Sequence, residues 1–551
     1  MTATLVRRQL VGIFSLIFLC TLPLQAATVP KYYFYIQFDH KVGTPYLLSN
    51  PSEFLSARAI ERRAHRAPVY DSTDLPINPS YLNQIEGLGV HIHCRSKWMN
   101  GVTAFITDSS LMSQVRALPF VKFARYTGKA SVAMPVSKIK KSPQQTQTFT
   151  YGIADAQLKG VNGKYLHSIG YRGKGIQVAI LDAGFTNANT NTAFDSLRSR
   201  GGILGAKSMV DPNTNVYAAD SHGANVLSIM AANVSGQFLG SAPDASYWLI
   251  QTEYAPTEYL VETDFWVAGL EFADSVGVDV VNSSLGYSSF DDASMNFTYS
   301  NLDGKTCRAS RAATLASQKG IMICNSAGND GAKTWKYISA PADAAGILTV
   351  GAVTADSTSS SFSSFGPSSD LRVKPEVCAL GTGTAFVNTS GAVSSGNGTS
   401  YSTPVMAGMM ACLLQYETEK NPNVSVQTII QNVIKTGHLY SAPTPQKGYG
   451  IPNIQLSMSS FATFAEMKEL ENEMVLVSYL NSEKSIKVEL LEHKPIAVAV
   501  RLYSMNGCLL MERPLTESIT LLQVGHFTSG VYAVCVSGDG KVVSKKLIIN
   551  T

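Results

Sequence analysis

Short apolar runs alternate with helical stretches through the middle of the chain, and this alternation constrains the fold more than any other feature. Helical stretches such as Phe265–Ala273 and Arg308–Lys319 lie between the runs. Strands that are buried on both faces and joined through helices form a parallel sheet covered by helices on each side. The sequence therefore predicts the α/β class, with catalytic positions at strand ends and helix N-termini. The apolar runs are Gln177–Leu181, Tyr247–Ile250, Val278–Val281, Ile321–Cys324 and Ile347–Val350.

A smaller α/β unit is predicted before this sheet. Ser52–His65 has apolar residues on one face, which predicts a helix with Ser52 as its N-cap. Asn100-Gly101 lies between two extended runs and predicts a hairpin, because both residues tolerate positive φ. The segment Thr127–Thr150 is rich in Lys, Pro, Ser and Gln and is predicted to be a linker. The other predicted elements of this unit are the strands Lys31–Phe38 and Phe120–Tyr126 and the helix Ser110–Leu118.

The pattern changes again after Asn453. Ser457–Glu473 is polar and predicts a connector. From Val475 onward short alternating strands are separated by the turn sequences Asn506-Gly507 and Gly538-Asp539-Gly540. This pattern predicts a small β-sandwich at the C-terminal end.

The first 26 residues have the layout of an export signal. Arg7 and Arg8 are followed by an apolar stretch, Leu10–Leu22, and by small residues at Ala26 and Ala27. Thirteen residues are too few to cross about 30 Å of hydrocarbon. Bulky residues precede Cys20, which disfavours a lipoprotein signal. We therefore expect a signal peptide over residues 1–26 and a soluble, exported mature protein.

Charge and cysteine content exclude several other classes of protein. Lys plus Arg exceed Asp plus Glu by only 44 − 40 = 4 among 551 residues, which argues against a partner that is a nucleic acid. The eight cysteines include no CxxC pair and show no zinc spacing. Cys324 and Cys412 lie in apolar runs and are predicted to be buried free thiols rather than part of a disulfide framework.

Three polar residues stand at the positions where a parallel sheet places its chemistry. Asp182 ends a buried strand, His222 lies near the first turn of an amphipathic helix, and Ser400 precedes a helix that is apolar nearly all round. Taken alone, each of these residues could have a purely structural role, as the cap of a turn or of a helix. Together they form the set that a serine nucleophile needs, because an imidazole must accept the hydroxyl proton and a carboxylate must orient that imidazole.

A fourth segment supports the same chemistry. Asn325–Gly331 follows the apolar strand Ile321–Cys324, and Asn329 within it could donate its amide to a developing oxyanion. Read alone, this segment is a turn rich in Gly and Asn. No G-x-S-x-G sequence marks the nucleophile elbow of an α/β-hydrolase.

These segments resemble the subtilisin-like serine peptidases over Gly152–Asn453, and the order Asp, His, Ser along the chain is the order known from subtilisin. The resemblance implies that Asp182, His222 and Ser400 form the catalytic triad and that Asn329 is the amide of the oxyanion hole. It implies that the primary specificity pocket is lined by Ser284, Leu285 and Gly286. The sequence departs from the family at Ala183, where a Ser or Thr is usual, and at Tyr401-Ser402-Thr403, where Met-Ala-Ser is more familiar.

The flanking units also resemble known companions of these enzymes. Residues 27–148 resemble a propeptide with its linker, which implies a folding assistant and temporary inhibitor, and residues 149–455 form the peptidase domain. After the connector, 456–474, residues 475–551 are similar to the sorting domain of type IX secretion in the Bacteroidetes. The alternative for this last unit is a generic β accessory or carbohydrate-binding domain. The sorting resemblance is carried by Val500–Tyr503, Asn506-Gly507, Gly530–Val534 and Lys545–Ile549.

The sequence thus predicts a secreted or cell-surface serine endopeptidase that passes through the periplasm and is made as a self-processing precursor. Its expected partners are protein or peptide substrates, its own propeptide and the secretion machinery. The chemistry needs no cofactor. The resemblance allows structural calcium, for which Asp291-Asp292 or Asp303-Gly304 could supply oxygens, although such residues are also common in solvated loops. Two alternatives are an inactive surface protein of this fold that only binds, and a serine hydrolase that is not a peptidase.

Overall fold

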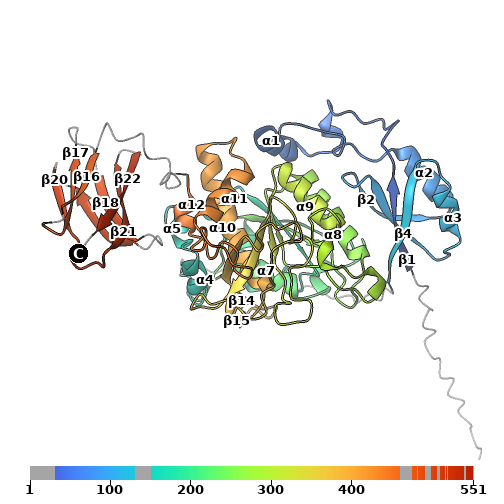
Figure 1. Cartoon of the computed structure of the whole chain (residues 1–551). Coiled ribbons are helices and arrows are strands. Elements are labelled where there is room, and N and C mark those ends of the chain that lie inside the picture. The colour runs from blue at the N-terminus through green and yellow to red at the C-terminus, as the bar shows by residue number, and fades with distance from the viewer. Residues whose placement is uncertain are drawn as a thin grey trace, which may run out of the picture.

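The structure is a computed structural model that describes residues 31–130, 150–459 and most of 475–549. Within the last range, residues 481, 491–497, 505–508, 516, 518 and 539–540 are outside the described part. Figure 1 shows an N-terminal unit, a central α/β unit and a C-terminal unit of strands in chain order. The expected signal peptide, most of the linker and most of the connector lie outside the described residues.

The central unit contains the predicted parallel sheet. Its order is β13-β12-β11-β10-β5-β9-β6, and every neighbouring pair is parallel. The five predicted apolar runs all form strands. The two edge strands, β6 and β13, are not among the predicted runs; β6 is only partly buried and therefore has no continuous apolar run. The strands are β5 (Gln177–Asp182), β6 (Ile203–Ser208), β9 (Ser246–Gln251), β10 (Val280–Ser283), β11 (Met322–Ser326), β12 (Leu348–Val353) and β13 (Val377–Leu380).

Helices cover both faces of this sheet and create two cores. On one face α7 (His222–Ala231) and α10 (Thr399–Lys420) pack with Val178 and Ile180 of β5. On the other face α8 (Val261–Val276) and α9 (Arg308–Gln318) pack with Ala179 and Leu181 of the same strand. A strand that is buried on both faces reads as a continuous apolar run for this reason. The remaining elements of the unit are α4 (Asp155–Gly160), α5 (Lys164–Ser168), α6 (Asp195–Ser199), α11 (Val426–Lys435), α12 (Ile454–Ser457), β7 (Asn233–Val234), β8 (Phe238–Leu239), β14 (Thr384–Val387) and β15 (Val393–Gly396).

The N-terminal unit is a four-stranded antiparallel sheet of order β2-β3-β1-β4 with helices beside it. Asn100 has a φ of 49° in the turn between β2 and β3, as its predicted hairpin requires. The strand β4 runs to Ala130, so the first residues of the predicted linker belong to the sheet. The elements are β1 (Lys31–Phe38), α1 (Ala57–Arg66), α2 (Pro79–Gly87), β2 (His91–Ser96), β3 (Gly101–Ile106), α3 (Leu111–Arg116) and β4 (Val121–Ala130).

The predicted helix Ser52–His65 is wrong in its start. Residues Pro51–Glu53 form a short 3₁₀ turn, and α1 begins only at Ala57. Ser56, and not Ser52, is the N-cap, because its Oγ accepts a hydrogen bond from the Ala59 amide at 3.1 Å. Phe54, an apolar residue within the predicted helix, therefore lies before α1.

The N-terminal sheet packs directly on the central unit. Tyr33, Tyr35, Trp98 and Met99 share one buried cluster with residues of α8 such as Trp266. At the start of α8, Gly128 of β4 leaves no room for a side chain, because a Cβ there would lie 2.7 Å from the Cβ of Tyr259. The two units are therefore held in one fixed arrangement along α8.

The C-terminal unit consists of two antiparallel sheets, β16-β17-β20 and β19-β18-β21-β22, consistent with the predicted small sandwich. Both predicted hairpins are present, since β18 pairs with β19 and β21 pairs with β22. Their turn residues 506–507 and 539–540 lie outside the described part. The strands are β16 (Val475–Leu480), β17 (Ser485–Leu490), β18 (Val498–Ser504), β19 (Leu509–Leu515), β20 (Ile519–Gln523), β21 (Gly530–Gly538) and β22 (Lys541–Ile549).

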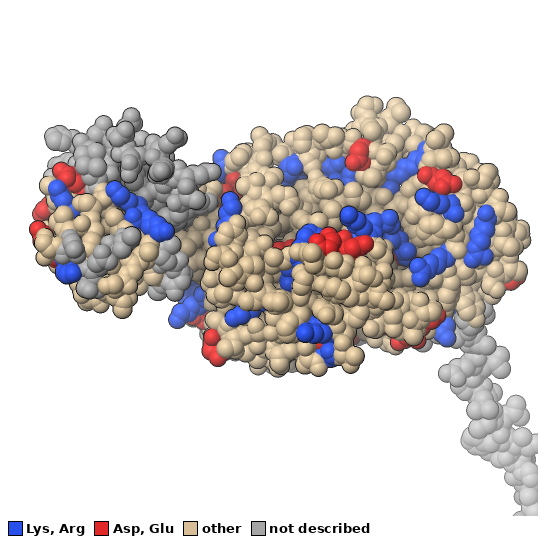
Figure 2. All heavy atoms as spheres, viewed as in Figure 1, with Lys and Arg blue, Asp and Glu red and all other residues tan. Residues whose placement is uncertain are grey.

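The surface and the cysteines agree with the composition. Uncharged residues cover most of the face in Figure 2, and the charged side chains lie in small groups of both signs. Cys94, Cys307, Cys324, Cys378 and Cys412 are free thiols, and all of these but Cys94 are buried. None of the helices in the described residues has the length and apolar character that crossing a bilayer requires.

Candidate active site

Asp182 lies at the carboxyl end of β5 and is fully buried. Its Oδ1 accepts hydrogen bonds from the Ala183 amide and from Nδ1 of His222, each at 2.8 Å. Its Oδ2 is buried and has no hydrogen-bond donor among the described residues. The alanine at 183 carries no hydroxyl that could serve this second oxygen.

His222 is the first residue of α7, and its backbone amide donates to Asp220 at 2.7 Å. The next residue must be glycine, because a Cβ on Gly223 would lie 2.4 Å from the carbonyl of Gly184 and 2.9 Å from the Cβ of Asp182. This close approach brings the start of α7 onto the end of β5. The His222 side chain remains 32% exposed, so it is partly accessible from solvent.

The pKa of His222 is raised from its ordinary value of 6.5 to about 9. Burial by itself lowers the pKa, because it disfavours the charged ring. The charge of Asp182 and its hydrogen bond to the ring outweigh burial, and Glu253 and Asp220 add to the rise. The site is thus built to stabilise an imidazolium.

Ser400 is the second residue of α10 and follows Gly398, whose φ is 156°. Its Oγ donates to the carbonyl of Ser284 at 3.2 Å, and the Oγ of Ser284 donates to the carbonyl of Ser400 at 3.0 Å. The next side chain, Tyr401, stacks on the imidazole of His222 with ring centres 6.2 Å apart. This contact brings the first turn of α10 to His222, although no hydrogen bond joins Ser400 to His222 within the described part of the chain.

Asn329 follows β11 and reaches the same helix start. Its Oδ1 accepts from the Thr399 amide at 2.9 Å and from the Thr399 hydroxyl at 3.0 Å. These two bonds fix the side-chain amide so that its nitrogen is the free end. That nitrogen lies near Gly398 and has no acceptor among the described residues. The residue is exposed, as a donor to a substrate must be.

The segment Ser284–Gly286 follows β10, which is next to β5 and β11 in the sheet. Ser284 and Leu285 are buried, and the carbonyl of Leu285 accepts from Asn325 at 3.3 Å. Gly286 is exposed and close to the Ser339 side chain, which lies 2.9 Å from where a Cβ would stand. All seven predicted site residues thus lie at one edge of the sheet and at the helix starts beside it.

Glu253 is a charged neighbour of this group that the sequence alone did not reveal. It lies two residues beyond Gln251, which pairs with Asp182 in the β5–β9 register. Burial and the charge of Asp182 raise the pKa of Glu253 to about 7, and His222 opposes this shift. Its signal in the sequence is an acidic residue just after an apolar strand, which becomes informative only when that strand is known to lie beside β5.

The two candidate calcium segments act as turn caps. Asp292 accepts from the Ser294 amide at 3.0 Å, and Asp303 accepts from the Lys305 and Thr306 amides at 2.7 Å. Within the described part of the chain, no group of three or more His, Cys, Asp or Glu side chains is arranged to hold a metal ion. Structural calcium has no support from these residues.

Comparison with known families accounts for all three units of the chain. Residues 173–451 match the subtilase family, residues 33–147 match the peptidase S8 propeptide domain of Bacteroidota, and residues 481–550 match a secretion system C-terminal sorting domain. The last match favours the sorting domain over a generic β accessory domain.

Individual relatives agree with the family match. Subtilisin NAT of Bacillus subtilis subsp. natto is 28% identical over 335 residues, which is 58% of this chain and 77% of the relative. Alkaline elastase YaB of Bacillus sp. (strain YaB) is 29% identical over 310 residues, or 56% and 70% of the two chains. Subtilisin BL of Lederbergia lenta is 28% identical over 313 residues, which is 56% of this chain and 98% of the relative.

The parallel sheet, the family match over about half of the chain and the two flanking matches lead to one conclusion. The sorting domain indicates a secreted or cell-surface protein. The chain belongs to the subtilase family, and it is a serine endopeptidase with a propeptide and a secretion sorting domain.

Proposed function

We propose that Asp182, His222 and Ser400 hydrolyse peptide bonds through an acyl-enzyme. The observation that carries this proposal is the 2.8 Å bond from His222 Nδ1 to the buried Asp182 carboxylate, at the helix start next to Ser400. The carboxylate holds the ring with its other nitrogen, Nε2, free to accept a proton. The raised pKa of His222 agrees with a site that stabilises the imidazolium formed in this step.

The bonds change in two stages. Ser400 Oγ leaves the Ser284 carbonyl, gives its proton to His222 and bonds to the scissile carbonyl carbon; His222 then protonates the departing amine. Water repeats the sequence on the acyl-enzyme, and the Ser400 hydroxyl is restored. The Asn329 amide and the Ser400 backbone N–H are proposed to bind the oxyanion in each stage. Ser284, Leu285 and Gly286 are proposed to line the primary specificity pocket.

A comparison of substrates tests the reaction class. We expect casein to be cleaved, with the loss of all cleavage after reaction with a fluorophosphonate. A protein that hydrolysed small esters and left casein intact would instead be a serine hydrolase of another class. A protein that neither cleaved nor reacted would be a binding protein on this fold.

Replacing Asn329 by alanine is expected to lower kcat by about 10² to 10³ with little change in KM, because the amide contacts the oxyanion and not the ground-state carbonyl. This range is the one measured for the corresponding amide in subtilisin. Steady-state kinetics on a chromogenic peptide measures both constants. Asn213→Ala, in an exposed loop, is the control and should leave both unchanged. An equal loss in the two variants would contradict the oxyanion role.

The pH dependence should follow the imidazole. Since His222 must be neutral to accept a proton, and since its pKa is raised, kcat/KM should fall as the pH falls through a value above 6.5. Glu253→Gln removes a negative charge that favours the imidazolium. The acidic limb of the pH profile, where kcat/KM falls, should therefore move down by about half a pH unit. Glu419→Gln, on the exposed end of α10, should leave the limb in place. If the pH at which kcat/KM falls were the same in Glu253→Gln, Glu253 would have no effect on the pKa of His222.

We also propose the roles of the flanking segments and the domain boundaries. Residues 1–26 would direct export, 27–148 would inhibit the enzyme until they are removed, and 149–455 would form the mature peptidase. Residues 475–551 would engage the secretion machinery. The three family matches support this division, since each falls within one of the proposed segments.

A further inference from the structure

Helix α1 of the N-terminal unit carries four arginines, Arg58, Arg62, Arg63 and Arg66, which we call the arginine clasp. Three of them recur at intervals of four residues and so lie on one side of the helix. Arg62 and Arg63 are buried, and Arg66 has 9% of its side chain exposed. Arginines are rarely buried unless they are paired, so each must have a partner across the contact.

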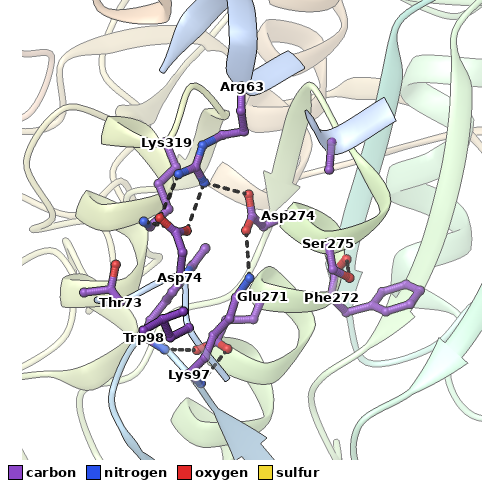
Figure 3. A network of polar contacts seen from close by, with 12 residues as sticks. Arg63, Thr73, Asp74, Lys97, Trp98, Glu271, Phe272, Asp274, Ser275 and Lys319 are labelled. Atoms are coloured by element: carbon purple, nitrogen blue, oxygen red, sulfur yellow. Dashed lines mark hydrogen bonds and ion pairs between the residues drawn. The ribbon is translucent and has the colours of Figure 1, made fainter. Parts of the chain in front are cut away.

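Asp274, near the end of α8, forms ion pairs with two of these arginines. Arg62 contacts its Oδ1 at 2.5 Å, and Arg63 lies 3.6 Å from the same oxygen. Lys97, which follows β2, lies 3.3 Å from Oδ2. Asp274 is fully buried, and these three cations overcome the effect of burial and lower its pKa. Figure 3 shows Arg63 and Lys97 approaching this carboxylate from two sides.

Asp279, just before β10, forms ion pairs with the other two arginines of the clasp. Arg66 contacts its Oδ1 at 2.9 Å, and Arg58 contacts Oδ2. The arginines also bind the two carbonyls that directly follow α8, since Arg58 donates to Gly277 at 3.1 Å and Arg62 donates to Val278 at 2.5 Å. The C-terminus of a helix carries partial negative charge, which adds to that of the two carboxylates.

One ion pair has the opposite polarity, with the cation on the central unit and the carboxylate on the N-terminal unit, and this makes the contact specific. Lys319, at the end of α9, donates to Asp74 of the N-terminal unit at 2.8 Å, and Arg63 contacts the same carboxylate at 3.0 Å. Figure 3 shows Asp74 between these two cations. Both sides of the interface therefore supply charges of both signs, with Lys319 on the central unit and Asp74 on the N-terminal unit completing the contact.

The clasp lies near the amino ends of the central strands, whereas the candidate active site lies at their carboxyl ends. Asp279 accepts from the amide of Gln177, the first residue of β5, whereas Asp182 is the last residue of that strand. Five steps of about 3.3 Å separate the two ends, or roughly 17 Å. The other end of α8 is held by Gly128 of β4, next to Tyr259. The N-terminal unit thus holds α8 at both ends.

Among the described residues, every cation paired with Asp274 and Asp279 comes from the segment before residue 131. A cut in the linker therefore removes none of the residues that make these contacts. We propose, building on the proposed processing of the linker, that the end of α8, with Asp274 and Asp279, is a docking site for the arginine clasp, and that this site, separate from the candidate active site, keeps the propeptide bound after the linker is cut. The fitting partner is a helix whose arginines are spaced to reach the two carboxylates and also the carbonyls of Gly277 and Val278.

The test uses the full chain made inactive by Ser400→Ala, so that its result does not depend on the catalytic assignment. A recognition sequence for a site-specific protease replaces residues 138–145, and the chain is held on a surface through its C-terminus. After the cut, the rate at which the propeptide is lost into buffer is measured. We expect slow loss, which NaCl accelerates, because salt screens the attraction between the charges once they separate and become exposed to solvent.

Substitutions on the less buried arm of the clasp give the sharpest comparison. Arg58→Gln with Arg66→Gln should raise the rate of loss at least about 30-fold, since truncating one side of a buried charge pair acts on dissociation. The control Arg125→Gln removes an exposed arginine of β4 and should change the rate by less than about twofold. Asp279→Asn should act like the double arginine variant, and combining all three changes should add little.

Melting of the uncut chains shows whether each variant is folded before the cut. Should the double variant unfold, Arg66→Gln alone serves as the milder change. Equal rates of loss in the clasp variants and in Arg125→Gln would overturn the proposal. Immediate loss of the propeptide from the unsubstituted chain would overturn it as well.

Discussion

Ser400→Ala is expected to abolish peptide hydrolysis, with a loss of roughly 10⁶ in kcat, which is the loss that removal of the nucleophile causes in subtilisin. The reason is that Ser400 is the proposed site of the acyl bond, so its replacement leaves no nucleophile for the scissile carbonyl carbon. Labelling by a fluorophosphonate should disappear at the same time. Hydrolysis of a chromogenic peptide and the fluorescence of the labelled band measure the two effects.

A second serine on the same helix provides the control. Ser402 is buried, and its hydroxyl donates to the Thr399 carbonyl at 3.1 Å. Ser402→Ala therefore removes a helix contact and leaves the nucleophile in place, so labelling should persist. Labelling that survived in Ser400→Ala would assign the nucleophile to another residue.

Self-processing is the second prediction with an all-or-none outcome. We expect the active chain to cut itself between about Lys138 and Tyr151, where the composition offers little to bury and exposed chain is cleaved most readily. Ser400→Ala, purified away from other peptidases, should keep this junction while the unsubstituted chain loses it. Mass spectrometry of the new N-terminus measures the position of the cut.

Two observations would separate self-processing from processing by another enzyme. If the Ser400→Ala chain were trimmed at the same rate in isolation, a separate peptidase would be required. If a small amount of the unsubstituted enzyme restored the cut in Ser400→Ala, the enzyme would act between molecules. A later cut near 457–473 would remove the sorting domain, and it would appear as a second, smaller product.

The strands of the central sheet could be predicted because they are buried on both faces. Such strands are continuous apolar runs, and this pattern survives without knowledge of the neighbours. The edge strand β6 failed this criterion, because three of its residues are half-buried and two are exposed. The start of α1 was misplaced because Ser52 and Ser56 are both acceptable caps, and only the chain path through Pro51–Glu53 decides between them.

The candidate site was predictable as a set of residues but not as a geometry. Asp182, His222 and Ser400 could be selected because their residue types and their places at strand ends and helix starts suit one reaction. The 2.8 Å pairing of Asp182 with His222 depends on α7 lying against β5 at Gly223, which no local pattern reveals. The influence of Glu253 depends likewise on β9 lying next to β5.

The sequence by itself determined the α/β class, the order of the units, the candidate residues and the family resemblance, because these depend on periodicity and short motifs. Only the tertiary structure decided which charges meet. The arginines of α1 lie more than 200 residues from Asp274 and Asp279 along the chain. Their spacing indicates one charged helix face, which is as typical of a solvated surface as of a buried contact. Burial and pairing distinguish the two cases, and both are properties of the folded chain.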